Sequence, residues 1–456
     1  MQIKELLNYL KINSDDERII SEIVTSTKDV VSNCVLILCR GHNIDPCLFI
    51  NDEIKSKCLL ILTDRPVEGG CFILNLKNRV FEILDYFYFR FNHHFKIIGI
   101  TGTEGKSSLS KIIFQSLKII HRKPLLITTE KTDKDMISTD LTTPTSKEVI
   151  DAMIKAEKEQ YDYLIMEVSC IGISEKRIDE KIFDYLFLTN LETDHLDYYD
   201  NVYQYHLSKI SLFQKNIKAK KFIFRESFDK YPNMFNHLTN LNIIENKDIK
   251  LKRSSLTHQV FAYKNHEYYS HLIFEQNRRN LAMLIEFLLT IKVYNSSFIV
   301  KRIKRILGRL DLIKSRPYVL IDYAHSSKSV ENVLKELSSF KQNQLIVVIG
   351  AGGNRDKQKR VEYGKICLKY ADKIYVTNDN PRNEDPLTIA KAIMVNEDER
   401  FILELNRKNA IKKAIKMADQ SDIVAILGRG NEEYQIVGNK RIYLSDYEEA
   451  KKCFIK

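Results

Sequence analysis

The chain has 456 residues, of which 44% are hydrophobic and 29% charged, and its formal net charge is +11. This length exceeds one ordinary hydrophobic core and predicts two or three domains, while no apolar run reaches the roughly 18 residues that a membrane-spanning helix needs. The 71 Lys and Arg residues are dispersed among 60 Asp and Glu residues, which suits polyanionic small ligands better than nucleic acid. The densest basic segment, 301–305, is interpreted as the solvated face of a helix.

The cysteines and the first 20 residues bear on the compartment. None of the eight cysteines forms a C-x-x-C pair or has metal-ligand spacing, which is typical of proteins in a reducing cytoplasm. Residues 1–20 have the pattern of an amphipathic helix and lack the apolar core of a secretory signal. We therefore expect a cytoplasmic protein, monomeric and without stable membrane insertion.

Strand and helix patterns alternate along most of the chain. Apolar residues at helical spacing predict helices at 107–120 and 277–291. Short apolar runs predict strands at 33–38, 58–63, 71–75, 95–101, 124–129, 162–168, 184–189, 221–225, 318–322, 344–350, 372–377 and 422–427. The alternation predicts an α/β protein with doubly wound, mostly parallel sheets. We divide the chain into three units, 1–88, 89–310 and 311–456.

The segment between the strand at 95–101 and the next helix is typical of a nucleotide-phosphate loop. Gly102 and Gly105 allow the backbone to approach a phosphate, and the helix N-terminus directs free N–H groups at it. Lys106 adds a positive charge for the terminal phosphates, and the Ser107 hydroxyl is placed to bind Mg²⁺. The usual first glycine of the motif is displaced by one residue, to Gly99. The alternative is an ordinary glycine turn capped by Ser107.

Two further candidates for metal ligands follow buried strands. Glu167 lies at the end of the strand at 162–168, where a carboxylate could bind Mg²⁺ opposite the phosphate loop. His195 lies between Asp194 and Asp197 after the next strand, and is interpreted as a second ligand. The alternatives are an ordinary loop glutamate and a structural histidine.

The third unit carries polar loops at the ends of its strands, where open α/β sheets bind ligands. Asp322 is suited to ribose hydroxyls, and Arg355 lies in a glycine-rich loop. With Arg382 and Glu432 after later strands, Arg355 could bind a zwitterion, guanidinium to carboxylate and carboxylate to ammonium. The alternative is a set of surface salt bridges, and composition does not separate the two.

Ordered motifs across nearly the whole chain resemble the Mur ligase family. They are G-I-T-G-T-E-G-K-S (99–107), T-T-P-T-S (142–146), M-E-V-S (166–169), T-N-L-E-T-D-H-L-D (189–197), N-R-R-N-L-A (277–282), G-R (308–309), D-Y-A-H (322–325), G-G-N-R-D-K (352–357), D-N-P-R-N-E-D-P (379–386) and G-R-G-N-E-E-Y-Q-I-V-G-N (428–439). The D-N-P-R segment accompanies selection of meso-diaminopimelate rather than lysine in this family. The resemblance implies a central ATP-binding unit, a C-terminal Rossmann-like unit and a small first unit for a uridine nucleotide.

The resemblance also implies roles in ATP and metal binding. Lys209 has no expected role on composition alone and is predicted as an exposed lysine, but it occupies the position that the family carbamylates into a metal ligand. ATP would contact Gly102, Thr103, Glu104, Gly105, Lys106, Ser107, Ser108, Asn277, Asn280, Arg309, Asp322 and His325. Two Mg²⁺ ions would be held by Ser107, Glu167, His195 and carbamylated Lys209. Lys106, Lys209, His195 and Glu167 are the residues expected to act in catalysis.

The two other substrates would be held by polar residues in all three units. The nucleotide peptide would contact Thr27, Gly41, His42, Thr142, Thr143, Ser169 and Arg177. The incoming amino acid would contact Arg355, Asp379, Asn380, Pro381, Arg382, Gly428 and Glu432. The chain departs from the family pattern at Cys170 and Ile171, usually Ser and His, and at Arg429 and Asn431, usually Lys and His.

The activity implied by the resemblance is ATP-dependent addition of meso-2,6-diaminopimelate to UDP-N-acetylmuramoyl-L-alanyl-D-glutamate, through an acyl phosphate, in peptidoglycan precursor synthesis. Three alternatives remain open. They are a Mur-type ligase for another substrate, such as a lysine-adding or secondary-metabolite enzyme, a folylpolyglutamate-synthetase-like ligase, and a degenerate nucleotide-binding scaffold without activity.

Overall fold

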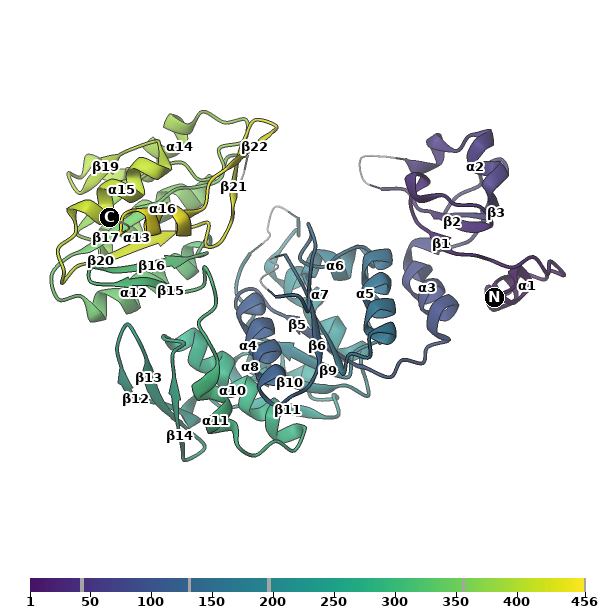
Figure 1. The fold of residues 1–456 in the computed structure, drawn as a ribbon, viewed down its shortest axis with the longest axis horizontal. Coiled ribbons are helices and arrows are strands. Elements are labelled where there is room, and N and C mark those ends of the chain that lie inside the picture. Colours follow the sequence, from purple (N-terminus) through teal and green to yellow (C-terminus); the bar gives the residue numbers. More distant parts are fainter. Residues whose placement is uncertain (42–44, 130–132, 195–197, 355–356, 455–456) are drawn as a thin grey trace.

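The computed structural model describes residues 1–41, 45–129, 133–194, 198–354 and 357–454. Figure 1 shows three α/β regions that follow one another along the chain, with the N-terminus and the C-terminus at opposite ends of the molecule. The predicted α/β class is confirmed, because each region is built on a mainly parallel sheet. Within the described residues, no helix is both long and apolar enough to cross a bilayer.

The first region has a four-stranded parallel sheet in the order β1-β2-β3-β4. Its elements are α1 (Ile3–Tyr9), β1 (Ile23–Val24), β2 (Cys34–Leu38), α2 (Asp52–Lys57), β3 (Cys58–Thr63), β4 (Cys71–Phe72) and α3 (Val80–Phe89). The strands predicted at 33–38 and 58–63 are confirmed, and the third is shorter than expected. The helix predicted over residues 1–20 is wrong beyond α1, because Lys11 adopts a left-handed backbone and the chain folds back to bridge Ile19 with Gln2.

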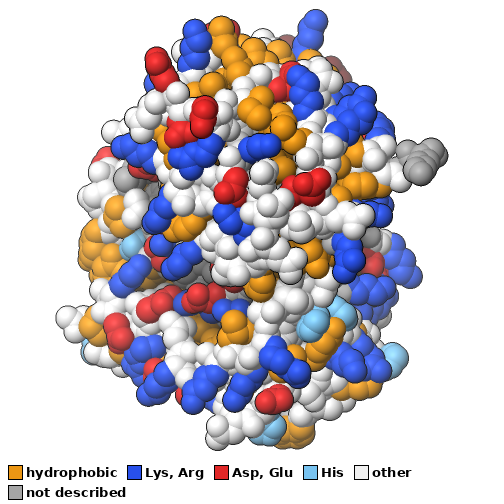
Figure 2. Space-filling view, turned by 90° about the vertical axis from the view of Figure 1, so that its left-hand side faces the viewer, with side chains coloured by type: hydrophobic (Ala, Val, Ile, Leu, Met, Phe, Trp, Pro, Cys, Tyr) orange, Lys and Arg blue, Asp and Glu red, His pale blue; other side chains and the backbone are white. Residues whose placement is uncertain are grey.

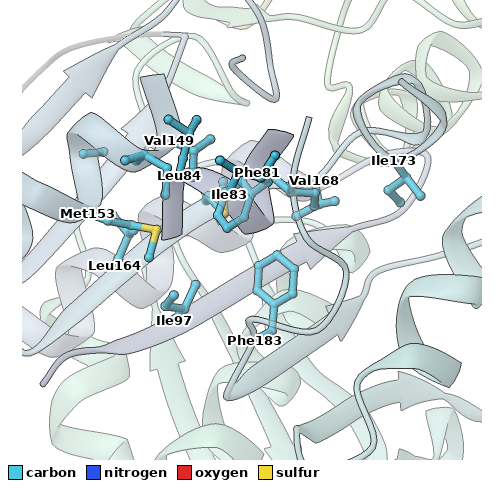
Figure 3. Close-up of a cluster of buried hydrophobic side chains, with 14 of the residues drawn as sticks. Phe81, Ile83, Leu84, Ile97, Val149, Met153, Leu164, Val168, Ile173 and Phe183 are labelled. Atoms are coloured by element: carbon cyan, nitrogen blue, oxygen red, sulfur yellow. The ribbon is translucent and has the colours of Figure 1, made fainter. Parts of the chain in front are cut away.

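The first region and the central region share one hydrophobic core. Side chains of α3 pack in the same buried cluster as helix α5 (Ser146–Lys158) and five strands of the central sheet. Figure 3 shows Phe81, Ile83 and Leu84 of α3 in this cluster with Val149 and Met153 of α5. Burial of these apolar surfaces joins the two regions by the hydrophobic effect.

The central region has a seven-stranded parallel sheet in the order β11-β10-β9-β5-β8-β6-β7. Its strands are β5 (Lys96–Thr101), β6 (Pro124–Thr128), β7 (Met136–Ser138), β8 (Tyr163–Glu167), β9 (Tyr185–Leu188), β10 (Lys220–Phe224) and β11 (Leu241–Ile244). Its further helices are α4 (Lys106–Ile119), α6 (Cys170–Ser174), α7 (Val202–Lys215), α8 (Arg225–Lys230), α9 (Pro232–Phe235), α10 (Glu275–Thr290) and α11 (Ser296–Arg302).

Alternating side chains of β5 place the central strand between two layers of helices. Ile97 joins the cluster that contains α5, whereas Ile98 and Ile100 join the cluster of α4 and α10. The predicted helices at 107–120 and 277–291 are thus confirmed as α4 and α10. An antiparallel sheet of β12 (Ile249–Ser254), β13 (Gln259–Tyr263) and β14 (His266–Ser270) was not predicted.

The basic segment at 301–305 is helical only at its start. Helix α11 ends at Arg302, so Lys301 and Arg302 form an exposed last turn, while Ile303 is buried and Lys304 lies beyond the helix. The predicted basic helix face is therefore correct for two residues and wrong for the rest. Figure 2 shows that basic side chains on one face of the molecule are interspersed with acidic ones, in agreement with the dispersed charge of the sequence.

The C-terminal region has a six-stranded sheet in the order β15-β16-β20-β17-β18-β19, in which only β15 is antiparallel. Its strands are β15 (Asp311–Ser315), β16 (Tyr318–Asp322), β17 (Leu345–Ile349), β18 (Lys373–Val376), β19 (Phe401–Leu403) and β20 (Ile423–Leu427), followed by the hairpin β21 (Tyr434–Val437) and β22 (Lys440–Tyr443). Its helices are α12 (Ser327–Phe340), α13 (Gln358–Tyr370), α14 (Pro386–Ile393), α15 (Arg407–Met417) and α16 (Asp446–Lys452). Helices α12 to α14 cover one face of this sheet, and α15 and α16 cover the other.

Candidate functional site

The loop from Gly102 to Gly105 joins β5 to α4 and is held in place by residues after β9. Gly102 has a φ of 142°, and a Cβ there would lie 1.9 Å from the Thr189 hydroxyl oxygen, so only glycine fits. The Asn190 side-chain oxygen accepts hydrogen bonds from the backbone N–H groups of Thr103 (3.1 Å) and Glu104 (3.0 Å). Thr189 and Asn190 are not among the predicted site residues, although their position directly after a strand was a usable signal.

Lys106 lies at the first position of α4, and its ammonium group folds back over the loop. Its Nζ donates to the carbonyl oxygens of Gly102 (3.0 Å) and Thr103 (2.9 Å). The positive charge is therefore already positioned at the place where the terminal phosphates of a nucleotide would enter, beside the N-terminus of a 14-residue helix.

Ser107 and Glu167 meet at the predicted metal site. The Ser107 hydroxyl donates to a carboxylate oxygen of Glu167 at 2.8 Å, and Glu167 is the buried last residue of β8, the strand next to β5. A hydroxyl and a carboxylate are hard oxygen donors of the kind that Mg²⁺ prefers, so the pair fits the expected ion. His195 lies outside the described residues.

Lys209 is buried, which contradicts the expectation from composition of an exposed lysine. The residue is 1% exposed on α7, and its Nζ lies 3.0 Å from the centre of the Tyr205 ring. No atom in the described part of the chain makes a hydrogen bond to this Nζ. Burial lowers the pKa of the Lys209 amine well below its usual value, because loss of water penalises the charged form.

The residues expected around the nucleoside lie on both sides of the phosphate loop. Asn280 is buried in α10, and a Cβ on Gly105 would lie 3.4 Å from its side-chain oxygen. Asn277 instead donates to the carbonyl of Ile273, which precedes α10, at 2.8 Å, so its amide makes a structural contact at the start of the helix. Ser108 is the third residue of α4, which begins at Lys106.

The C-terminal region brings its own residues to this loop. Asp322 accepts from the backbone N–H groups of Leu310 (2.7 Å) and Ala324 (2.8 Å), and the Arg309 guanidinium lies 4.1 Å from the centre of the Tyr323 ring. Burial raises the pKa of Asp322 and lowers the pKa of His325, whose Nδ1 is 3.1 Å from the Tyr323 carbonyl oxygen.

Polar contacts near the phosphate loop join the central and C-terminal regions, in addition to a hydrogen bond from the Glu275 N–H to Glu336 and the stacking of Phe274 on Phe340. The Ser326 hydroxyl at the start of α12 donates to the Glu104 carboxylate in the phosphate loop. On α13, the Lys359 ammonium lies 3.3 Å from a carboxylate oxygen of Asp194. The phosphate loop is therefore bounded by the C-terminal region in this arrangement.

The residues predicted for the nucleotide peptide form two groups. Thr143 and Ser169 have hydroxyl oxygens 3.0 Å apart at the end of β8, and Arg177 donates to the Thr143 carbonyl at 3.0 Å. Thr142 precedes Thr143 in the same loop. In the first region, Thr27 follows β1 and Gly41 follows β2, so both lie at the carboxyl edge of the small sheet. His42 lies outside the described residues.

The residues predicted for the amino acid also cluster. The Asn380 amide nitrogen donates to a Glu432 carboxylate oxygen at 3.1 Å. A Cβ on Gly428 would lie 2.8 Å from an Asp379 carboxylate oxygen, which places those two loops in contact. Arg382 donates to the Gly353 carbonyl at 2.8 Å, and Pro381 lies against the same glycine. Arg355 lies outside the described residues.

Burial and nearby charges set the pKa of Glu432. Burial and the Asp379 carboxylate raise the pKa, while Arg429, the Asn380 amide and Arg407 lower it. Burial is the largest influence, so the net effect is a raised pKa for Glu432.

A phosphate loop with a buried carboxylate, faced by a second α/β region that carries polar loops, defines a nucleotide-dependent enzyme built from three units. Comparison with known families makes the class more specific. Residues 100–297 match the Mur ligase middle domain, and residues 308–430 match the Mur ligase glutamate ligase domain.

Full-length relatives agree with these matches. The chain is 30% identical to UDP-N-acetylmuramoyl-L-alanyl-D-glutamate–2,6-diaminopimelate ligase of Aquifex aeolicus, over 94% of this chain and 92% of that one. It is also 30% identical to the protein of the same name from Clostridium perfringens, over 97% and 96%. The chain belongs to the Mur ligase family, whose members are ATP-dependent amide ligases.

Solved structures share the fold. A structure of a 2,6-diaminopimelate ligase of the same name superimposes with a TM-score of 0.70 at 22% identity, over 99% of this chain and 98% of that one. The MurF ligase of Thermotoga maritima, solved with ADP, has a TM-score of 0.64 at 15% identity, over 95% and 96%. The three-unit Mur ligase architecture expected from the sequence is thereby confirmed.

Proposed function

We propose that this enzyme adds meso-2,6-diaminopimelate to UDP-N-acetylmuramoyl-L-alanyl-D-glutamate in the cytoplasm, as a step of peptidoglycan precursor synthesis. The observation that carries the proposal is the cluster of Asp379, Asn380 and Glu432 beside Arg382. An anionic group next to a guanidinium suits an amino acid with both an ammonium and a carboxylate. The names of the full-length relatives agree with this substrate pair.

Different residues of the chain act in the two steps of this reaction. Lys106 and the loop N–H groups hold the terminal phosphates of ATP, so that the substrate carboxylate can attack the γ-phosphorus and release ADP. The amine of the incoming amino acid, held by Glu432, then attacks the acyl phosphate, and phosphate leaves as the amide forms. Contact between Glu104 and Ser326 places the C-terminal region against the loop, which limits access of water to the acyl phosphate.

Ser107, Glu167, His195 and Lys209 are proposed to hold two Mg²⁺ ions, and those ions would offset repulsion between the phosphate oxygens and the attacking carboxylate. The pair of Ser107 and Glu167 fits this role by its chemistry. For Lys209 to serve, its neutral amine must add to CO₂ and lose a proton, which gives a carbamate. A buried amine with a lowered pKa and no hydrogen-bond partner in the described residues supports that modification.

The proposal is tested by supplying the purified enzyme with the nucleotide dipeptide, ATP and Mg²⁺, and a panel of amino acids. Mass spectrometry is expected to detect one new amide product, formed with meso-diaminopimelate, together with ADP. Product formed only with lysine or another amine would show that the enzyme is a Mur-type ligase with a different amino-acid substrate. No ADP release with any member of the panel would favour a scaffold without activity.

A second test, which uses a substitution, shows whether the site selects diaminopimelate over lysine. Arg382→Ala is expected to weaken use of diaminopimelate while lysine, which lacks the second carboxylate, is affected little. An unchanged amino-acid preference would favour a different substrate. A folylpolyglutamate synthase of Mycobacterium tuberculosis shares the fold, with a TM-score of 0.62 at 16% identity, and glutamate belongs in the panel for that reason.

A further inference from the structure

Arg429 is a charged side chain with no access to solvent. It lies two residues after the end of β20, between Gly428 and Glu432 in the same loop, and it is 0% exposed. The sequence motif of the family has a lysine at this position, so the guanidinium is a feature of this chain. A buried charge is costly unless it is paired and hydrogen-bonded, and its partners therefore indicate its role.

The guanidinium contacts both ends of the hairpin β21–β22. Its Nη2 donates to the carbonyl oxygens of Tyr434 (2.9 Å), the first residue of β21, and Leu444 (3.0 Å), which follows β22. The hairpin is in turn joined to the loop at 379–382, because the Ile436 N–H donates to the Asn380 side-chain oxygen at 2.8 Å. Arg429 thus anchors the hairpin that packs against the amino-acid loop.

The same guanidinium fixes which way the Asn380 amide points. Its Nη1 lies 3.4 Å from the Asn380 side-chain oxygen, which also accepts from Ile436. With two donors on the oxygen, the amide nitrogen must point the other way, and there it donates to one oxygen of Glu432 at 3.1 Å. Asn380 therefore holds the Glu432 carboxylate in one orientation.

The local charges explain why an arginine is tolerated here. Arg429 Nε is 3.8 Å from Asp446, a carboxylate that also makes a two-pronged pair with Arg407 at 2.6 and 2.8 Å. One buried carboxylate thus serves two guanidinium groups, which leaves an excess positive charge. Arg429 Nη1 lies 3.9 Å from Glu432, so this excess charge faces the carboxylates of Glu432 and Asp379.

We propose that Arg429 is a positioning residue for the amino acid, acting through Asn380 to hold the Glu432 carboxylate in one orientation toward the incoming ammonium group. This inference rests on the proposed function, because it assumes that Glu432 receives the amino acid. Arg429 itself is buried behind Asn380 and the hairpin, and it contacts no substrate.

The test compares three variants by steady-state ADP release with varied diaminopimelate and varied ATP. Arg429→Gln removes both the positive charge and the several N–H donors of the guanidinium, whereas Arg429→Lys keeps only the charge. The control, Arg441→Gln, removes an exposed charge from β22 of the same hairpin. Arg429→Gln is expected to raise KM for the amino acid about tenfold, the equivalent of one charged hydrogen bond, with KM for ATP unchanged. Arg429→Lys should give an intermediate KM.

The pH profile separates positioning from a merely structural role. The groups that act on Glu432 are Asp379, which raises its pKa, and Arg429 and Arg407, which lower it. Loss of the Arg429 charge raises that pKa further, so the acidic limb of kcat/KM for the amino acid should move to higher pH in Arg429→Gln. Arg429→Lys should retain the wild-type limb.

Two results would contradict the positioning role of Arg429. Equal changes in KM for ATP and for the amino acid, or an unshifted acidic limb in Arg429→Gln, would overturn it. Circular dichroism and the thermal midpoint monitor folding, and if Arg429→Gln does not fold, an unchanged amino-acid KM in Arg429→Lys overturns the inference alone. A wild-type enzyme that releases no ADP with any amino acid overturns the proposed function first.

Discussion

At the scale of single residues, the chemistry depends on groups whose properties are set by burial. Lys209 lies against the Tyr205 ring and has a lowered pKa, whereas Lys106 donates to two loop carbonyls. We propose different tasks for these two lysines of one region, one as a modified metal ligand and the other as a fixed positive charge. The difference follows from their surroundings and not from the residue type.

Lys209→Ala is expected to lower kcat by about a hundredfold or more, the usual effect of removing one preorganised electrostatic group. Short carboxylates such as acetate or formate should restore part of the activity, because they can occupy the volume of the missing carbamate. The measurement is ADP release with and without the additive. Lys215→Ala, at an exposed position on the same helix, is the control, and wild-type rates for Lys209→Ala without additive would contradict the assignment.

Lys106→Ala should abolish ATP-dependent product formation, because the phosphate loop loses its only side-chain cation. Binding of a fluorescent ATP analogue and formation of the amide product are the two measurements. Undiminished turnover in this variant would show that the loop at 102–105 is not the phosphate site.

At the scale of elements, Gly99 explains why the phosphate-loop motif looks displaced by one residue. It lies inside β5, and a Cβ there would lie 2.6 Å from the Phe183 ring and 2.8 Å from Leu186. The glycine therefore permits close packing beneath the loop, while the loop itself uses Gly102 and Gly105. The displaced glycine is a matter of core packing and not of phosphate contact.

Gly99→Ala is consequently expected to destabilise the fold by about 1–3 kcal/mol, the usual cost of overpacking a core. Urea unfolding should show a lower midpoint, and the folded fraction should still bind ATP. Adding Phe183→Leu, which shortens the side chain in conflict, should recover part of the loss. An unchanged midpoint for Gly99→Ala would mean that the core can rearrange around the added methyl group.

The elements that the sequence predicted are those with a strong apolar pattern. β2, β17 and β20 are buried at every position, and their ranges agree with the prediction within a residue or two. β12 and β22 are mostly exposed and carry Lys and Arg, so their sequences lack the apolar signal of a strand. Backbone pairing to neighbouring strands, which the sequence pattern does not encode, makes them strands.

Tertiary contacts that the sequence pattern does not encode also limited the prediction of the site. Ser107 and Glu167 were predicted from motifs at strand ends, and they meet at 2.8 Å. Burial of Lys209 and Arg429 depends on what packs over them from distant segments. Charged residues are ordinarily predicted to be exposed, so only the family resemblance suggested a role for Lys209, and nothing in the sequence suggested one for Arg429.

At the scale of the whole molecule, the central and C-terminal regions meet through an apolar cluster that includes Ile273 and Phe274 and through two polar contacts around the phosphate loop. Glu104 and Ser326 form one, and Asp194 and Lys359 form the other. The two polar contacts are weak enough to break and re-form, so the regions can shift against each other at the loop while the apolar cluster stays packed.

Lys359→Ala should shift the enzyme toward a more open arrangement by removing the ion pair with Asp194. The expected effect is a two- to fivefold rise in KM for ATP, roughly the free energy of a partly exposed ion pair. Small-angle scattering should give a larger radius of gyration for the variant than for Lys365→Ala, which removes an exposed lysine from the same helix. Identical scattering curves and identical KM values would contradict this view of the contact.

The interleaving of Phe81, Ile83 and Leu84 with Val149 and Met153 has a practical consequence for engineering (Figure 3). A chimera that exchanges the first region with that of a relative should be joined before Leu76, so that α3 stays with α5, against which it packs. A junction after Phe89 would combine two halves of a packed surface that did not evolve together, and such hybrids should aggregate or express poorly.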